Sequence, residues 1–191
     1  MKRISDAIRQ SVEVKQKILG SPEILVTIRD IAETCSHALC IGNKILFCGN
    51  GGSAADAQHL AAELSGRFYY DRPPLAAESL TVNTSFITAV ANDYSFDNIF
   101  ARMLNGIGQE GDVLIGLSTS GNSENVIRAF KAAHEKGIIT VGLTGEDGGK
   151  LAQLSDFIIR VPSSDTPRIQ ESHILIGHII CELVESSIFP K

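Results

Sequence analysis

The stretch CGNGGSAADAQHLAAELSGR, residues 48–67, joins a glycine-rich turn to an alanine-rich helix. The residues that lead into it, Lys44 to Cys48 (KILFC), form a short apolar run bounded by turn residues, which is typical of a buried strand. A strand followed by a turn and a helix is the unit from which parallel α/β sheets are built. Such sheets bind ligands at the carboxyl ends of their strands, where this turn would lie.

The rest of the chain alternates in the same way. We expect further strands at residues 112–117, 138–143 and 157–161, and a weaker one at 78–82. Helices are predicted at residues 2–19, 22–39, 53–65, 85–92, 97–108, 123–136, 149–154 and 168–187. This alternation predicts a parallel sheet with helices on both faces. The first two helices precede the first strand, so they either cover the domain or form an oligomer interface.

Composition narrows the class of protein. The chain has 191 residues, enough for one domain with a substantial core, and its net charge of -5 argues against a general nucleic-acid binder. The first ten residues, MKRISDAIRQ, lack the apolar segment of a secretory signal, and no stretch is apolar enough to span a bilayer. The four cysteines form no CxxC pair. We therefore expect a cytoplasmic protein with free thiols.

Two loops follow predicted strands and lead into helices. They are Gly49–Ser53 (GNGGS) and Ser118–Ser123 (STSGNS). Free N–H groups and the positive dipole end at a helix N-terminus favour an anion, and the hydroxyls add donors. Each loop alone could be only a turn with an N-cap. Neither has the spacing of a Walker A or dinucleotide-binding motif, so the pair together favours a small sugar phosphate.

His59 and Glu63 lie four residues apart and therefore share one face of the predicted helix, with Asp56 on the same stripe. We expect the pair one to two turns from the phosphate loop. An exposed helical ion pair is the alternative. The other positions of this helix are mostly alanine and leucine, which predicts close packing on most of its sides and argues against an exposed ion pair.

The last predicted helix contains a second polar group. His178 lies in an apolar run, ILIGHII, where an imidazole needs a partner. One interpretation is a core histidine that bonds Glu182 one turn later. The other is a metal ligand or proton carrier that faces the first cluster. The spacing alone leaves both interpretations open.

Several segments together resemble bacterial phosphoheptose isomerases of the SIS domain superfamily. They are CGNGGS, HLAAEL, the AND of residues 91–93, STSGNS, LTGEDGGK and RIQESH…GH, and they span nearly the whole chain. The resemblance implies a three-layer α/β/α sandwich with a five-stranded parallel sheet. It implies a single SIS domain over 1–191, with a helical segment 1–40 that packs in the oligomer and a core at 41–191. It also implies a homotetramer with active sites between subunits.

The activity that this resemblance implies is the conversion of D-sedoheptulose 7-phosphate to D-glycero-D-manno-heptose 7-phosphate through an enediol. This would be the first step toward ADP- or GDP-heptose for lipopolysaccharide or other surface glycans. Matching the motifs gives one zinc per subunit, held by His59, Glu63, Gln170 and His178. The same match makes Glu63 and His178 the acid–base pair. It places substrate at Asn50, Gly51, Gly52, Ser53, Asn92, Asp93, Ser118, Thr119, Ser120, Ser123 and Gln170.

At two positions the match between the family's site residues and this chain is incomplete. Gln170 and His178 are eight residues apart, about 12 Å along a straight helix, so Gln170 ranks below the other three as a zinc ligand. Some relatives carry an acid immediately before Arg168, where this chain has Pro167, and Asp165 is near enough to substitute for it.

A non-catalytic relative supplies the alternative function. The DnaA initiator-associating protein has the CGNG loop and the RIQE segment, but it lacks the carboxylate that matches Glu63 and the imidazole that matches His178. Its second loop reads STRGNS. Because this chain has Glu63, His178 and Ser120, the sequence favours catalysis over binding of the initiator.

Overall fold

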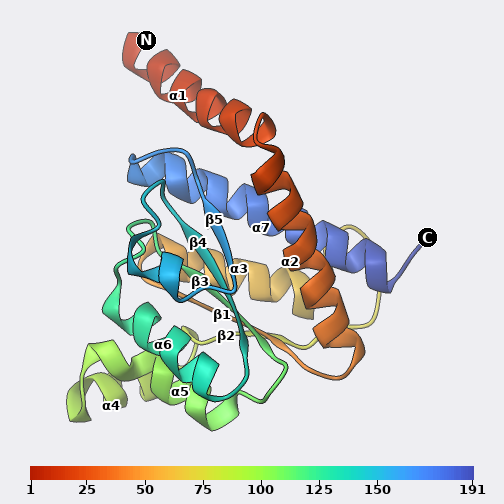
Figure 1. Ribbon diagram of the computed structural model, residues 1–191, viewed down its shortest axis with the longest axis vertical. Coiled ribbons are helices and arrows are strands. Elements are labelled where there is room, and N and C mark those ends of the chain that lie inside the picture. The colour runs from red at the N-terminus through yellow and green to blue at the C-terminus, as the bar shows by residue number, and fades with distance from the viewer.

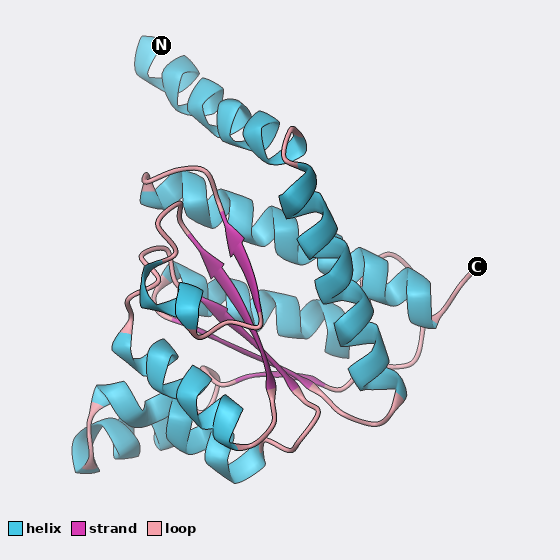
Figure 2. Ribbon diagram, viewed as in Figure 1, coloured by secondary structure: helices cyan, strands magenta, loops and turns pink.

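The computed structural model describes residues 1–191 and contains one parallel five-stranded sheet of order β2-β1-β3-β4-β5. The strands are β1 (Ile45–Gly49), β2 (Ala77–Ser79), β3 (Val113–Leu117), β4 (Ile139–Thr144) and β5 (Phe157–Arg160). All five predicted strands are present, and the weak one is shorter than expected. The predicted parallel sheet and the α/β sandwich are confirmed (Figure 2).

Helices cover both faces of the sheet (Figure 1). One layer contains α1 (Lys2–Leu19), α2 (Pro22–Cys40), α3 (Gly52–Ser65) and α7 (Thr166–Ile188). The other contains α4 (Thr84–Asp93), the 3-10 helix η1 (Phe96–Asn98), α5 (Ile99–Ile107) and α6 (Glu124–Glu135), with the 3-10 helix η2 (Gly149–Gln153). The segments predicted as single helices at 97–108 and 149–154 are therefore η1 followed by α5, and a 3-10 helix.

The two cores follow from the alternation of side chains along the strands. In β1, Ile45 and Phe47 pack into the core under α2, α3 and α7, whereas Leu46 and Cys48 pack into the core under α5 and α6. Every residue of β1 and β3 is buried. Both faces must therefore be apolar, which explains why these strands read as continuous hydrophobic runs.

The leading helices differ in how much they bury. Ser21 caps α2 by accepting a hydrogen bond from the N–H of Ile24, and Pro22 occupies the first turn. Helix α1 extends away from the sheet (Figure 1), and only Val14 and Ile18 of its residues are buried. None of the helices combines the length and apolar character that crossing a membrane requires.

A buried carboxylate joins the amino ends of the central strands. The Asp112 side chain is 0 % exposed, and it accepts hydrogen bonds from the N–H groups of Lys44 and Gln109 and a 2.8 Å ion pair from Lys44 Nζ. Burial alone would raise the pKa of Asp112, but the bonds from Lys44, Gln109 and Asn43 together lower it below the ordinary value. Asp112 therefore fixes the register of β1 against β3 at the edge opposite the ligand loops.

Candidate active site

The first predicted ligand loop has a backbone that only glycine permits. A Cβ on Gly49 would lie 2.7 Å from the carbonyl oxygen of Ser53, and Gly51 has a φ of +55°. Helix α3 begins at Gly52, and neither Gly51 nor Gly52 donates its N–H to another backbone group. These free donors at the positive end of α3 are suited to a phosphate oxygen.

A pair of amides joins the first loop to the beginning of α6, the helix that follows the second loop. Asn50 Nδ2 donates to Asn125 Oδ1, and Asn125 Nδ2 donates to Asn50 Oδ1, both at 2.8 Å. In the second loop the hydroxyls of Ser118 and Ser123 are 3.0 Å apart. Sequence reasoning did not single out Asn125, which lies in the first turn of α6 and is 2 % exposed. Its role depends on a contact 75 residues away, which no local pattern reveals.

A hydroxyl-rich hollow of about 240 Å³ lies beside the second loop. Thr119 and Ser120 line it together with Ser163, Ser164 and Thr166, which follow the end of β5. The hollow therefore lies at the carboxyl edge of the sheet, where the fold is expected to bind ligands. The three residues after β5 were not predicted as site residues, and their position at the same sheet edge was the only signal.

Gln170 lies with the first loop. A Cβ on Gly52 would be 2.8 Å from Gln170 Nε2, so the amide of this α7 residue packs directly against the beginning of α3. Gly52 is required for this close approach. Gln170 therefore lies beside the first loop, and its contact with substrate stays a prediction.

Three side chains that the sequence singled out converge between α3 and α7. His59 Nε2 is 2.8 Å from His178 Nε2 and 3.2 Å from Glu63 Oε1. One donor atom from each of these residues lies within 4.8 Å of the others. Two imidazoles and one carboxylate are a donor set that Zn²⁺ accepts with a further position left for substrate or water. The three residues together are called the His59 cluster below.

The helices can meet here because α7 has no side chain at the crossing. A Cβ on Gly177 would lie 2.5 Å from a methyl of Leu60, so α7 packs directly on α3 one residue before His178. His178 faces His59, and the Phe68 ring lies 5.6 Å from its ring. Glu182 is exposed and forms no hydrogen bond with His178. Of the two interpretations of His178, the structure favours the one in which it faces the first cluster.

Asp56 adds a second carboxylate to the α3 stripe, beside Glu63. Burial raises the pKa of Asp56 above its ordinary value, and the nearby His59 and His178 oppose this shift.

Known proteins match the chain along its length. The SIS domain family matches residues 21–145. A phosphoheptose isomerase from Aneurinibacillus thermoaerophilus is 55% identical over 97% of this chain and 94% of that protein. The structure of a phosphoheptose isomerase from Neisseria gonorrhoeae has a TM-score of 0.90 at 45% identity, covering 97% of this chain and 98% of that one. A phosphoheptose isomerase structure from Francisella tularensis gives 0.92 at 36% identity, with 97% of both chains covered.

The chain belongs to the phosphoheptose isomerase family of SIS-domain proteins.

In this phosphoheptose isomerase family member, α3 runs from the predicted phosphate loop at its beginning to His59 and Glu63 farther along the helix. His59 lies about two turns and Glu63 about three turns from Gly52, roughly 10 and 16 Å along the axis. The expected separation of one to two turns is therefore too short for Glu63. In a heptose 7-phosphate the reacting carbons lie far from the phosphate, so a long separation suits this substrate class.

The predicted packing of α3 on most sides is only partly right. Ala55, Gln58 and Ala62 are exposed, and the side chains of His59 and Glu63 are 49% and 24% exposed. The buried side of α3 consists of Ala57, Leu60, Ala61 and Leu64, with Ser53 at its start. Because these exposed residues of α3 are not covered by another element of the chain, the His59 cluster is accessible from the surface on that side.

Asn92 and Asp93 lie apart from the other site residues of the isomerase fold. Both are exposed at the end of α4, and Asn92 Nδ2 donates to Asp93 Oδ1 at 2.9 Å. No hydrogen bond joins either side chain to the two loops or to the His59 cluster. Within one chain the structure does not bring this pair to the site.

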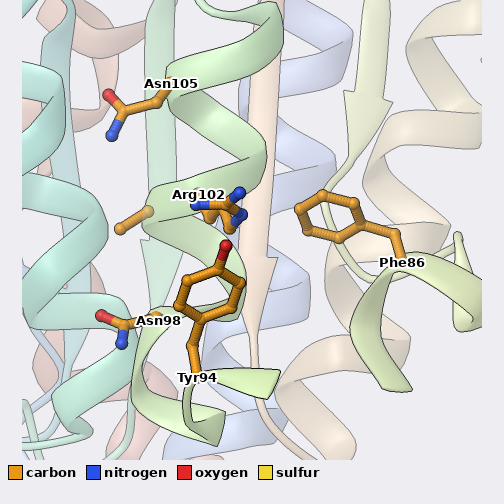
Figure 3. Close-up of a pocket in the computed structure, with 6 residues that line it drawn as sticks. Phe86, Tyr94, Asn98, Arg102 and Asn105 are labelled. Carbon is orange, nitrogen blue, oxygen red and sulfur yellow. The ribbon is translucent and has the colours of Figure 1, made fainter. Parts of the chain in front are cut away.

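A larger hollow, of about 570 Å³, lies between α4 and α5 and contains none of the predicted site residues (Figure 3). Phe86, Tyr94 and Asn105 line it, and the Arg102 guanidinium lies 4.2 Å from the centre of the Tyr94 ring. The hollow has no carboxylate or imidazole in its lining. Size alone therefore does not locate the active site of this isomerase family member.

Proposed function

We propose that the protein is a ketose–aldose isomerase that converts D-sedoheptulose 7-phosphate to D-glycero-D-manno-heptose 7-phosphate. The observation that carries this proposal is that His178 of α7 converges with His59 and Glu63 of α3, the helix that begins at the proposed phosphate loop. Relatives and solved structures named phosphoheptose isomerase support it over nearly the whole chain. The comparisons do not favour the alternative function of binding the replication initiator.

The phosphate of the substrate would bind at the N-terminus of α3. Free N–H groups of Gly51 and Gly52 support this placement, together with the hydroxyls of the second loop. The proposed substrate contacts are Asn50, Gly51, Gly52, Ser53, Asn92, Asp93, Ser118, Thr119, Ser120, Ser123 and Gln170. The sugar chain would then run along α3 toward the His59 cluster.

Glu63 and His178 are proposed as the acid–base pair. The carboxylate of Glu63 takes a proton from C1, while the imidazole of His178 provides a proton to the C2 carbonyl oxygen, which gives the enediol. Glu63 then returns its proton to C2, and His178 takes the proton from the C1 hydroxyl, which leaves an aldehyde at C1. Both side chains end the cycle in the state in which they began it.

His59, Glu63 and His178, with Gln170 as a weaker candidate, are proposed to hold one zinc ion per subunit. The donor atoms of the first three already converge without rearrangement of the backbone. Bound zinc would organise these ligands or polarise the substrate carbonyl. Glu63 has two carboxylate oxygens, of which Oε1 faces His59, so one oxygen can bind metal while the other receives a proton.

We further propose a homotetramer with active sites between subunits. The exposed apolar side chains of α1 support an interface there: Ile4 and Ile8 are each 61% exposed and Val12 is 47% exposed. The exposed pair Asn92 and Asp93 would then complete the site of a neighbouring subunit. A single SIS domain, with segment 1–40 in the oligomer interface and core 41–191, is part of the same proposal.

The proposed place of action is the cytoplasm. All four cysteines are free in the structure, and free thiols are the usual state in a reducing compartment. The product would supply heptose precursors for lipopolysaccharide or other surface glycans.

The test is turnover of sedoheptulose 7-phosphate by the purified protein, after chelation and again after zinc is restored. We expect an aldoheptose 7-phosphate that forms only with metal. Product at the same rate after complete chelation would refute the zinc proposal. If no product formed in either state, the loops would be a binding site only, and binding to the initiator protein would be tested next.

A further inference from the structure

We propose that Arg72 and Glu185 are positioning residues that hold Glu63 and His178 in place for metal binding and proton transfer. The inference rests on the proposed function for its catalytic part. Arg72 lies in the segment between α3 and β2, and Glu185 lies near the end of α7. Neither belongs to the His59 cluster. They are joined by a 2.9 Å ion pair from Arg72 Nε to Glu185 Oε1, with side chains only 2% and 1% exposed.

Arg72 acts on Glu63 through the backbone. Its Nη2 donates to the carbonyl oxygen of Glu63 at 2.9 Å, and its Nη1 donates to the carbonyl of Leu64 at 2.8 Å and to that of Gly66 at 3.2 Å. The last carbonyls of a helix have no partner within it, and they form the negative end of its dipole. The guanidinium therefore fixes the turn of α3 from which the Glu63 side chain projects.

Glu185 acts on His178 through Phe68. One carboxylate oxygen accepts the N–H of Phe68 at 3.0 Å, and the other accepts the N–H of Tyr69 at 2.8 Å. These bonds fix the backbone of Phe68, whose ring packs 5.6 Å from the His178 ring. Glu185 also lies on α7, two turns after His178, so it ties the helix of one proposed ligand to the helix of the other two.

A planar guanidinium fork suits this task better than an apolar contact would. A buried ion pair is weak evidence for stability, because removing two charges from water costs about as much as their attraction returns. The fork does fix direction, since its five donors are rigidly arranged, and Arg72 uses them on four carbonyls and one carboxylate. Residues behind metal ligands orient them, and their loss typically lowers metal affinity or activity by about 10–100-fold.

A purely structural ion pair predicts a different result from a positioning pair. If the pair only stabilises the fold, its weakening lowers resistance to urea and leaves the folded protein's zinc affinity, kcat and KM unchanged. If it positions Glu63 and His178, zinc affinity and kcat fall. KM changes less, because the phosphate loops lie at the other end of α3, away from the pair.

The matched control is Asp112, the buried carboxylate at the amino ends of β1 and β3. Like Glu185 it accepts two backbone N–H groups and one cationic side chain, with one further bond from the Asn43 amide, and it contacts no residue of the His59 cluster. The experiment compares Glu185→Gln and Arg72→Lys with Asp112→Asn in the full chain. The measurements are zinc affinity by competition with a chelator, kcat and KM for sedoheptulose 7-phosphate, and the urea midpoint.

We expect Glu185→Gln and Arg72→Lys to lose about tenfold or more in zinc affinity and in kcat, with KM changed less than about twofold. Asp112→Asn should lose resistance to urea while zinc affinity and kcat stay at the wild-type values. The inference is overturned if the two pair variants fold and keep wild-type zinc affinity. It is equally overturned if Asp112→Asn loses zinc affinity to the same extent.

If neither pair variant folds, Phe68→Leu decides the question, because it removes the aromatic contact with His178 and leaves the ion pair intact. A several-fold loss of zinc affinity supports the inference, and an unchanged affinity overturns it. Zinc affinity can be measured whether or not the wild-type protein turns over sedoheptulose 7-phosphate. Failure of the proposed function and failure of the positioning role are therefore seen in different measurements.

Discussion

Asp112 and Glu185 are both buried carboxylates that accept two backbone N–H groups and one cationic side chain. Asp112 lies at the amino ends of two neighbouring strands, and its partners Asn43, Lys44 and Gln109 lie in the segments that lead into those strands. Glu185 lies on α7, and its partners belong to the segment that leaves α3. Similar local chemistry is thus used at two points of one fold.

The difference lies in what the joined elements carry. The strands that Asp112 joins present only apolar side chains to the two cores. The helices that Glu185 joins carry His59, Glu63 and His178 on their open side. The consequence of a buried ion pair is thus decided by what its neighbours along the chain carry, and not by the pair's own geometry.

The largest expected effect tests whether the His59 cluster is the reactive group at all. Glu63→Gln and His178→Ala should each lower kcat by about 10²–10⁴-fold, because each removes a proton carrier. His37→Ala is the control, since it removes an exposed imidazole on α2 from outside the site. Steady-state kinetics gives the answer. Near-normal activity in both cluster variants would refute the acid–base assignment.

The next largest expected effect is the loss of unfolding free energy when the cation of either buried ion pair is removed. Arg72→Met leaves Glu185 buried without its cation, and the expected loss is about 3–5 kcal/mol of unfolding free energy. Lys44→Met should cost less, because the Lys44 side chain is 22% exposed and water can replace it beside Asp112. Urea unfolding of both variants provides the comparison. Equal losses would show that the exposure of the cation does not matter.

Acid should weaken both pairs in the same direction. Burial alone would raise the pKa of Glu185, but the bonds from Tyr69, Phe68 and Arg72 lower it below 4.5, and the pKa of Asp112 is lowered below 3.8. The unfolded chain therefore takes up these protons first as pH falls. The stability that the two carboxylates contribute is full above those ordinary values and is lost as pH falls through the lower folded-state values. In Glu185→Gln this loss should be smaller, as urea midpoints between pH 7 and 3 would show.

His173 contributes in a higher pH window and must be separated from the carboxylates. Burial lowers the pKa of His173 from 6.5 to about 4, against a hydrogen bond with the carbonyl of Thr144. A lowered pKa in the fold means that the unfolded chain binds the proton first, so stability falls as pH drops from about 6.5 to about 4. This slope should persist in Glu185→Gln and Asp112→Asn. Its disappearance in either variant would contradict the assignment to His173.

The smallest expected effect compares two glycines with positive φ. Gly51 has a φ of +55° in the first ligand loop, and Gly42 has a φ of +88° in the turn before β1, with no atom near the Cβ position of either. Each substitution by alanine should cost about 1–3 kcal/mol of stability. Only Gly51→Ala should also raise KM, since it disturbs the phosphate loop. A rise in KM for Gly42→Ala would argue against that localisation.

Much of the fold could be predicted from the sequence because its signals are local. Continuous apolar runs such as Val113–Leu117 predict strands buried on both faces, and Ser21-Pro22 marks the beginning of a helix. The strand Ala77–Ser79 is shorter than the predicted 78–82, and the helix predicted at 149–154 is a 3-10 helix at Gly149–Gln153. Both are too short to show a period.

The site residues also divide into those that a local pattern predicts and those that only a tertiary contact brings together. The spacing of His59 and Glu63 alone predicts that they share one face of a helix. The position of the glycine loops directly after strands predicts an anion site. The pairing of His178 with His59 requires α7 to cross α3 at Gly177 and Leu60, which is a tertiary contact. Arg72 lies in the polar sequence DRPP, which predicts an exposed turn, and its burial depends on a partner 113 residues later.

The strand order has a consequence for synthesis of the chain. β1 lies between β2 and β3, yet β3 begins more than 60 residues after β1 ends. At about 5–20 residues per second, a ribosome needs several seconds to supply that neighbour. During this interval the apolar sequence ILFCG has one unpaired edge, which is the kind of segment that pairs with foreign strands. Nascent chains arrested before Val113 should therefore depend on chaperones far more than chains arrested after Thr144.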